Sequence, residues 1–128
     1  MNLLLDTCTF LWLIVDASEL SRSARDMFRD PANEVFLSAV STWEIAVKHA
    51  LGRLPLPDLP ERYIPAQRRA HAITPLPLDE DATLTLRRLP SLHRDPFDRM
   101  LVCQALSSDL TILTPDPLIT AYPARTLW

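Results

Sequence analysis

Short apolar runs alternate along the chain with longer segments in which apolar residues recur every three or four positions. The short runs predict strands, at residues 2–6, 34–38, 73–78, 110–114 and 124–128. The longer segments predict helices, at residues 9–15 (where a strand is not excluded), 20–30, 39–52, 61–72, 79–90 and 97–109, with a short helix or turn at 116–122. Strands separated by helices need crossover connections, so we expect one α/β domain over residues 1–128, with three layers and a mostly parallel sheet of about five strands.

Two of the expected helices carry a clear apolar face. In segment 20–30 this face consists of Leu20, Ala24, Met27 and Phe28, and Ser21 is the expected N-cap. In segment 39–52 it consists of Val40, Trp43, Val47 and Leu51. Gly52 is expected to end this second helix.

Composition narrows the class of protein. Hydrophobic residues make up 48% of the 128 residues, which is typical of a globular chain, and a single glycine excludes glycine-rich phosphate loops. Cys8 and Cys103 lie in apolar segments without metal-ligand spacing, so we expect two buried free thiols and a cytoplasmic protein. The apolar start has no basic region and is interrupted by Asp6, so we expect no membrane segment.

Four acidic residues occur where a parallel sheet places its active site, beyond the carboxyl ends of the strands. Asp6 and Asp116 follow predicted strands, whereas Glu44 and Asp98 lie early in predicted helices. Four carboxylates in one crevice repel each other, and a divalent cation removes that penalty. Oxygen ligands without paired His or Cys favour Mg²⁺ or Mn²⁺ over zinc.

Helix capping offers a competing explanation for most of these acids. Asp95 before Pro96 is a standard helix start, and Asp116 before Pro117 repeats it. Ser41 and Glu44 have the spacing of a capping box. With Asp95 as the N-cap, helix capping does not require a second acid at Asp98. We also expect that capping does not explain Asp6, because this residue ends a strand.

The net charge of −3 is unusual for an RNA-binding protein. Setting the four candidate acids aside leaves twelve acidic against thirteen basic residues, a balance of +1. Arg94 and Arg99 flank the acid pair and are the expected phosphate contacts. Ser38 and Thr114, at strand ends, either bond the acids or act as turn and cap residues. For His93 we favour a structural loop role over contact with a phosphate.

Four stretches together are similar to a known family. "LLLDTCTFLW", "SAVSTWEIAVKHALGRL", "HRDPFDRMLVCQA" and "ILTPDPLITAY" resemble, in this order, the PIN-domain ribonucleases, and most closely the VapC toxins of toxin–antitoxin modules. The resemblance implies a PIN-like α/β/α fold and a Mg²⁺-dependent endoribonuclease, with Mn²⁺ as a possible substitute. Its acidic quartet maps onto Asp6, Glu44, Asp98 and Asp116.

The resemblance also implies roles and partners. Asp6 and Asp98 are the expected metal ligands, and Glu44, Asp116 and Asp95 form a second tier around them. The expected partners are an RNA substrate, a second copy of the chain and an antitoxin that covers the helices near residues 9–30 and 39–52. We expect no membrane partner.

Two other functions stay open at this point. One is a different Mg²⁺-dependent phosphohydrolase or a receiver domain, which usually places a second acid beside or two residues after the first. Thr7 and Cys8 occupy those positions here, which argues against both. The other is a non-catalytic RNA-binding or interaction module whose acids serve only as helix caps.

Overall fold

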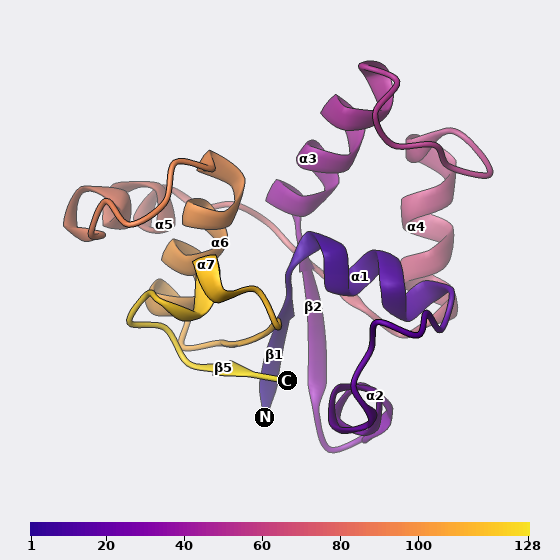
Figure 1. The fold of residues 1–128 in the computed structure, drawn as a ribbon, viewed down its shortest axis with the longest axis horizontal. Coiled ribbons are helices and arrows are strands. Elements are labelled where there is room, and N and C mark those ends of the chain that lie inside the picture. Colours follow the sequence, from indigo (N-terminus) through magenta and orange to yellow (C-terminus); the bar gives the residue numbers. More distant parts are fainter.

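A five-stranded, entirely parallel sheet forms the centre of the computed structural model, which describes residues 1–128 (Figure 1). The strand order is β3-β2-β1-β4-β5. The strands are β1 (Asn2–Leu5), β2 (Glu34–Ser38), β3 (Thr74–Leu76), β4 (Thr111–Leu113) and β5 (Thr126–Leu127). The parallel sheet expected from the sequence is confirmed, and the proline-containing β3 lies at an edge, where a missing N–H is tolerated.

Seven α-helices connect the strands. They are α1 (Thr7–Ile14), α2 (Arg22–Arg29), α3 (Ala39–Ala50), α4 (Pro60–Ala70), α5 (Glu80–Thr85), α6 (Pro96–Ser107) and α7 (Pro117–Thr120). A 3₁₀ turn, η1 (Leu86–Arg88), continues α5. The longest of them, α3 and α6, have 12 residues each, and none has the length and apolar content needed to cross a bilayer.

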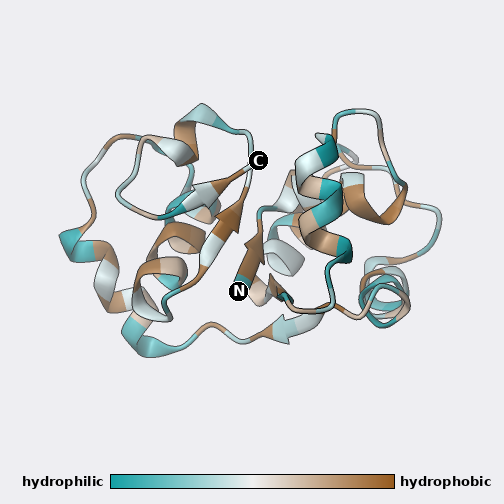
Figure 2. Cartoon of the chain, turned by 90° about the horizontal axis from the view of Figure 1, so that it is seen from below, coloured by the Kyte–Doolittle hydropathy of each residue, from teal (hydrophilic) through white to brown (hydrophobic).

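The central strand β1 separates two hydrophobic clusters. Its alternate residues point to opposite faces, so Leu3 and Leu5 join the cluster under α1, α2 and α4, while Leu4 joins the cluster under α6 and α7. Figure 1 shows these two groups of helices on opposite sides of the strands. In Figure 2 the central strands are largely hydrophobic, and hydrophilic residues colour the outer helical surfaces. The expected three layers are confirmed.

Several local predictions about helix ends are confirmed. Ser21 caps α2 by accepting a hydrogen bond from the Ala24 N–H at 2.9 Å. Asp95 caps α6, and Pro96 occupies its first turn. Gly52 follows the end of α3 with φ +71°, a backbone conformation that side chains with a Cβ rarely adopt.

The four apolar residues predicted on one side of α3 differ in burial, because Val40 is 1% exposed and joins the core but the others do not follow it. Trp43 is 56% and Leu51 61% exposed, whereas Ile45, which was not predicted on that face, is fully buried. Ser38 caps this helix, so the expected capping box of Ser41 and Glu44 is wrong. Both polar side chains turn inward because Thr7 on α1 offers them a hydrogen-bonding partner. Because Ser41, Glu44 and Ile45 face inward, Trp43 lies on the outer side of the helix.

The two cysteines differ from each other. Both are free thiols, as expected. Cys103 is buried in α6, but Cys8 is exposed, so the prediction of two buried thiols is wrong for Cys8. The reason is position: Cys8 lies in the first turn of α1, on the side turned away from the core cluster that holds Phe10.

Candidate active site

Asp6 lies at the carboxyl end of β1 and is held through both of its carboxylate oxygens. Oδ1 accepts a hydrogen bond from the Thr9 N–H at 2.7 Å, and Oδ2 accepts one from the Thr114 hydroxyl at 2.5 Å. Asp6 is therefore the N-cap of α1. Our expectation that capping does not account for Asp6 is wrong, because α1 begins at Thr7 rather than at residue 9.

Asp116 lies beside Asp6, after β4. Its N–H donates to Thr114 Oγ1 at 3.1 Å, and its own Oδ1 accepts from the Leu118 N–H and caps α7. The Thr114 hydroxyl therefore links two of the predicted acids. Both alternatives for this threonine are present, because its hydroxyl bonds the Asp6 carboxylate and also accepts the N–H two residues later, as in a turn.

Ser38, by contrast, bonds none of the acids. Its hydroxyl accepts from the Val40 N–H as the cap of α3 and donates to Gln104 Oε1. Gln104 in turn donates to the Pro77 carbonyl at 3.2 Å. Ser38 is fully buried, so its expected role at the substrate is corrected to a structural one that ties α3 to α6.

Glu44 reaches the same end of the sheet from the second turn of α3. It is 4% exposed, accepts a hydrogen bond from the Thr7 hydroxyl at 2.7 Å, and pairs with Lys48 Nζ. It caps no helix. Sequence reasoning missed Lys48, although its spacing of four residues from Glu44 and its status as the only lysine of the chain were visible signals.

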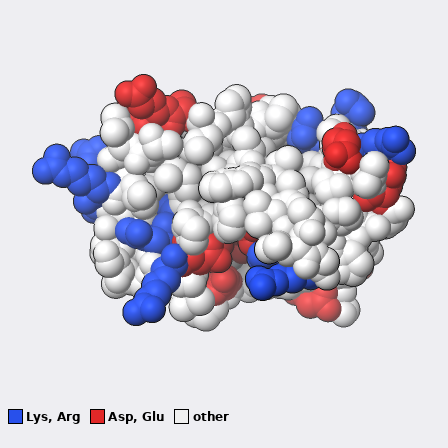
Figure 3. Space-filling view, turned by 90° about the horizontal axis from the view of Figure 1, so that it is seen from above, with Lys and Arg blue, Asp and Glu red and all other residues white.

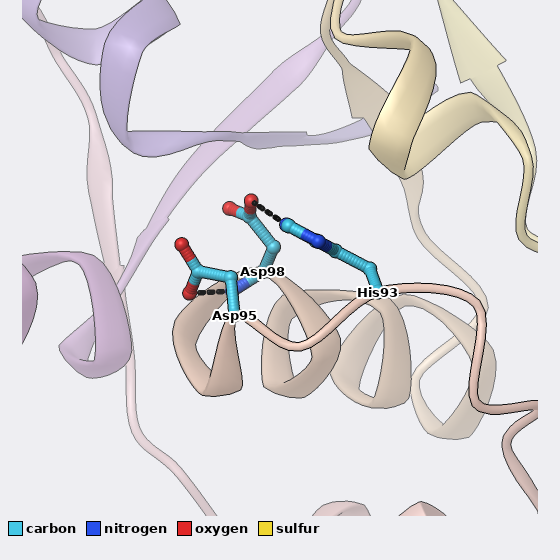
Figure 4. A group of neighbouring side chains, drawn as sticks. All are labelled: His93, Asp95 and Asp98. Carbon is cyan, nitrogen blue, oxygen red and sulfur yellow. Dashed lines mark hydrogen bonds and ion pairs between the residues drawn. The ribbon is translucent and has the colours of Figure 1, made fainter.

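Asp95 and Asp98 occupy the start of α6 together with His93 from the preceding loop (Figure 4). Asp95 Oδ1 accepts from the N–H groups of Phe97 and Asp98, at 2.8 and 3.2 Å. His93 Nε2 lies 3.2 Å from Asp98 Oδ2. In Figure 4 both carboxylates stand on the same side of the first helical turn, and the imidazole reaches toward Asp98.

Burial governs the ionisation of Asp6. It raises the pKa of this carboxyl above its ordinary value of 3.8, while the hydrogen bonds from Thr114 and Thr9 oppose the rise. The charge of Asp116 adds to the rise. A carboxylate in these surroundings gains from any cation that approaches its free lone pairs.

Asp98 has the most perturbed carboxyl of the site. Burial, and after it the charge of Asp95, raises the pKa of Asp98 to about 6 from 3.8, against the lowering effect of the His93 hydrogen bond. Glu44 and Asp116 add to the rise. Electrostatic effects therefore connect the four predicted acids, since Asp116 acts on Asp6 and Asp98 and Glu44 acts on Asp98. Figure 3, which views the face above the carboxyl ends of the strands, shows acidic side chains gathered near its middle and basic ones at their sides.

The tightest group of possible metal ligands differs from the predicted quartet. His93, Asp95 and Asp98 each offer one ligand atom, and these atoms lie within 4.8 Å of one another. No three members of the quartet meet that distance. Carboxylate oxygens dominate the whole cluster, and hard oxygen donors fit Mg²⁺ or Mn²⁺. Sequence reasoning placed His93 outside the ligand set because the turn of loop 91–95 that brings it back to α6 has no signature in the pattern.

Comparison with known proteins identifies the family to which this chain belongs. The model of the PIN domain family matches residues 3–123, so the chain belongs to the PIN domain family. It is 36% identical over 67 residues to Ribonuclease VapC16 of Mycobacterium tuberculosis, a match that covers 52% of this chain and 48% of VapC16. The matched region thus spans about half the length of that relative.

Solved structures share the fold over almost the whole chain. VapBC2 from Rickettsia felis, bound to a DNA fragment from its promoter, superposes with a TM-score of 0.74 at 11% identity, covering 99% of this chain and 98% of the other. VapBC-1 from nontypeable Haemophilus influenzae superposes with a TM-score of 0.64 at 20% identity, covering 99% and 97%. Identities this low establish the α/β fold and no more.

Proposed function

We propose that the protein is a Mg²⁺-dependent endoribonuclease and the toxin of a toxin–antitoxin pair. The observation that carries the proposal is the cluster of buried or half-buried carboxylates at the carboxyl end of a parallel sheet, with the pKa of Asp6 and Asp98 raised. Such a cluster is unfavourable by itself and becomes favourable around a divalent cation. Membership in the PIN domain family and the similarity to Ribonuclease VapC16 support it.

In this proposal each acid has a role. Asp6 and Asp98 hold the ion, Glu44 and Asp116 orient its water ligands, and Asp95 contributes from the second tier. When bound, Mg²⁺ lowers the pKa of a coordinated water and stabilises charge on the phosphate oxygens. Thr114 and Thr9 fix the orientation of the Asp6 carboxylate through their hydrogen bonds.

Lys48 has a different role, because it carries the positive charge nearest to Glu44. It balances the charge of this buried carboxylate, which otherwise adds to the repulsion within the cluster. The hydroxyl of Thr7 supplies a second hydrogen bond to Glu44. Together these contacts fix the carboxylate in one position before any substrate arrives.

The proposal includes an antitoxin partner and a homodimer in the cytoplasm. The solved structures with the same fold include VapBC complexes. On this chain, apolar side chains are exposed on the helical segments 9–30 and 39–52, among them Val15, Trp43 and Leu51. Apolar groups left in water on neighbouring helices favour burial against another protein.

The rival function, a non-catalytic module with capping acids, draws support from Asp6, Asp95 and Asp116, all of which cap helices. It leaves Glu44 and Asp98 unexplained. Neither caps a helix, and Asp98 sits among other carboxylates that raise its pKa. The proposed nuclease accounts for all five residues.

The deciding experiment compares Asp98→Asn with Asp81→Asn. Asp81 is an exposed acid in the first turn of α5, so its replacement makes the same chemical change at a similar helical position away from the site. We expect wild type and Asp81→Asn to cleave RNA in Mg²⁺ and to stop in EDTA, and Asp98→Asn to fold but not cleave. Full cleavage by folded Asp98→Asn would refute the proposal, and hydrolysis of small phosphoesters in place of RNA would favour the other phosphohydrolase.

A further inference from the structure

A hollow of about 720 Å³ lies at the loop before α6, lined by Ser91, Leu92, His93, Arg94 and Arg99. His93 belongs both to this hollow and to the acidic group, since its Nε2 lies 3.2 Å from Asp98 Oδ2. The hollow is therefore directly next to the cluster of carboxylates. Unlike that cluster, it is lined by cationic side chains and contains no carboxylate.

The two arginines of the hollow have no carboxylate partner. Arg25, Arg62 and Arg125 each pair with an aspartate, whereas Arg94 and Arg99 form no ion pair. In addition, Arg99 Nε is buried without a hydrogen-bond partner. A guanidinium that is partly removed from water and lacks an acceptor is stabilised by an anion, and phosphate matches its fork of donors.

We propose that this hollow is a phosphate-binding subsite, in which Arg94 and Arg99 hold a backbone phosphate of an RNA strand whose neighbouring phosphate lies at the acidic cluster. This inference rests on the proposed function for its choice of RNA. The two cations lie in a hollow separate from the carboxylates, which explains how a protein with a net charge of −3 attracts RNA. The arginines supply the attraction that the carboxylates cannot supply.

The test measures RNA binding rather than cleavage. Each variant is made in the Asp98→Asn background, so that a fluorescein-labelled single-stranded RNA of about twelve nucleotides stays intact while anisotropy is recorded in Mg²⁺. The variants are Arg94→Ala, which changes an exposed side chain, and Arg99→Met, which keeps the apolar stem of a half-buried one. Arg22→Ala is the matched control, because it removes an equal charge from an exposed, unpaired arginine on α2.

We expect Arg94→Ala and Arg99→Met each to weaken binding about tenfold, as for the loss of a hydrogen bond to a charged group. Each should also lower the slope of log affinity against log salt by about 0.7, the value for one contact on a single strand. Arg22→Ala should change affinity less than about twofold. Thermal melting of the variants verifies folding, and Arg94→Ala decides the question if Arg99→Met does not fold.

Three results would overturn the subsite. The first is that both hollow variants bind RNA as Arg22→Ala does. The second is that inorganic phosphate binds to the protein through Arg94 while the affinity for RNA is unchanged, which would assign the hollow to a free anion. The third is an absence of RNA binding by the Asp98→Asn protein that keeps both arginines, whereas RNA cleavage by wild type is judged separately. Failure of the cleavage experiment alone leaves the binding result intact, so the two proposals are separable.

Discussion

The hydroxyl of Thr114 donates a hydrogen bond to Asp6, a residue 108 positions earlier in the chain. It also accepts the N–H of Asp116, so one side chain at the end of β4 orients two of the acids. β1 and β4 are adjacent parallel strands, and their carboxyl ends are therefore adjacent too. The sheet thus brings together groups from the two ends of the sequence.

Replacing this hydroxyl tests its contribution. We expect Thr114→Val to lower the free energy of unfolding by about 1–3 kcal/mol, because a buried carboxylate loses a donor. The loss should also raise the pKa of Asp6 further, since this bond opposes the rise, and should weaken Mg²⁺ binding at neutral pH. Urea unfolding and calorimetric titration of Mg²⁺ measure the two effects. Thr120→Val, at an exposed threonine on α7, is the control, and equal losses in the two variants would contradict the assigned role.

The raised pKa of Asp98 predicts a dependence of stability on pH. Its value of about 6 lies above the ordinary 3.8, so the folded protein binds this proton more tightly than the unfolded chain does. The resulting stabilisation is fully present below the unfolded value and is lost as the pH rises through about 6. In EDTA at a pH of about 7.5, Asp98→Asn should therefore be more stable than wild type by about 1–3 kcal/mol.

This gain should fade at a pH of about 3, below the unfolded value of 3.8, where Asp98 is mostly protonated in both states. Mg²⁺ should reverse the order, because it stabilises the ionised carboxylate of wild type and has less to bind in the variant. Urea unfolding at the two pH values, with and without Mg²⁺, measures both effects. A wild type more stable than Asp98→Asn in EDTA at the higher pH would contradict the prediction, and Asp81→Asn should change stability by less than about 0.5 kcal/mol.

The ion pair between Lys48 and Glu44 predicts that removing Lys48 increases the affinity for Mg²⁺. Its ammonium pairs with Glu44, and the hydrogen bond to this carboxylate raises the pKa of Lys48, which keeps it charged at neutral pH. Removing that charge in Lys48→Met should tighten Mg²⁺ binding by roughly threefold or more at low ionic strength, because a competing cation is gone. The effect should shrink in high salt, and Lys48→Arg should restore the wild-type value. Weaker Mg²⁺ binding by folded Lys48→Met would contradict the prediction and show that the positioning of Glu44 by Lys48 outweighs its competition with the ion.

The orientation of α3 predicts that replacing Ile45 costs more stability than replacing Trp43. Ile45 is fully buried, so Ile45→Ala should cost about 2–5 kcal/mol. Trp43 is exposed and makes an edge contact with Phe97 at 4.8 Å between ring centroids, so Trp43→Ala should cost only about 1 kcal/mol. Chemical denaturation of the two variants measures the difference. A larger loss for Trp43→Ala than for Ile45→Ala would contradict the orientation of α3 in which Ile45 is buried and Trp43 exposed.

Most of the fold was readable from local patterns. The alternation of apolar runs and helical segments predicted the parallel sheet, and Ser21, Gly52 and Asp95 marked helix ends correctly. These features depend on residues only a few positions apart, such as a side-chain oxygen and an N–H two or three residues later. The family resemblance likewise pointed to the four acids, because each of them lies within a short contiguous stretch of the sequence.

By itself, then, the sequence determined the order of the elements, the parallel sheet and the acids that follow its strands. The tertiary structure decided which way α3 faces, that Asp6 is both a cap and a partner of Thr114, that His93 meets Asp98, and that Cys8 lies outside the core. The physical reason is the range of the interactions. The hydrogen bond between Thr114 and Asp6 joins residues 108 positions apart, so it forms only after distant segments have packed together. The pKa of Asp98 is likewise raised only once folding buries this carboxyl near acids from other segments.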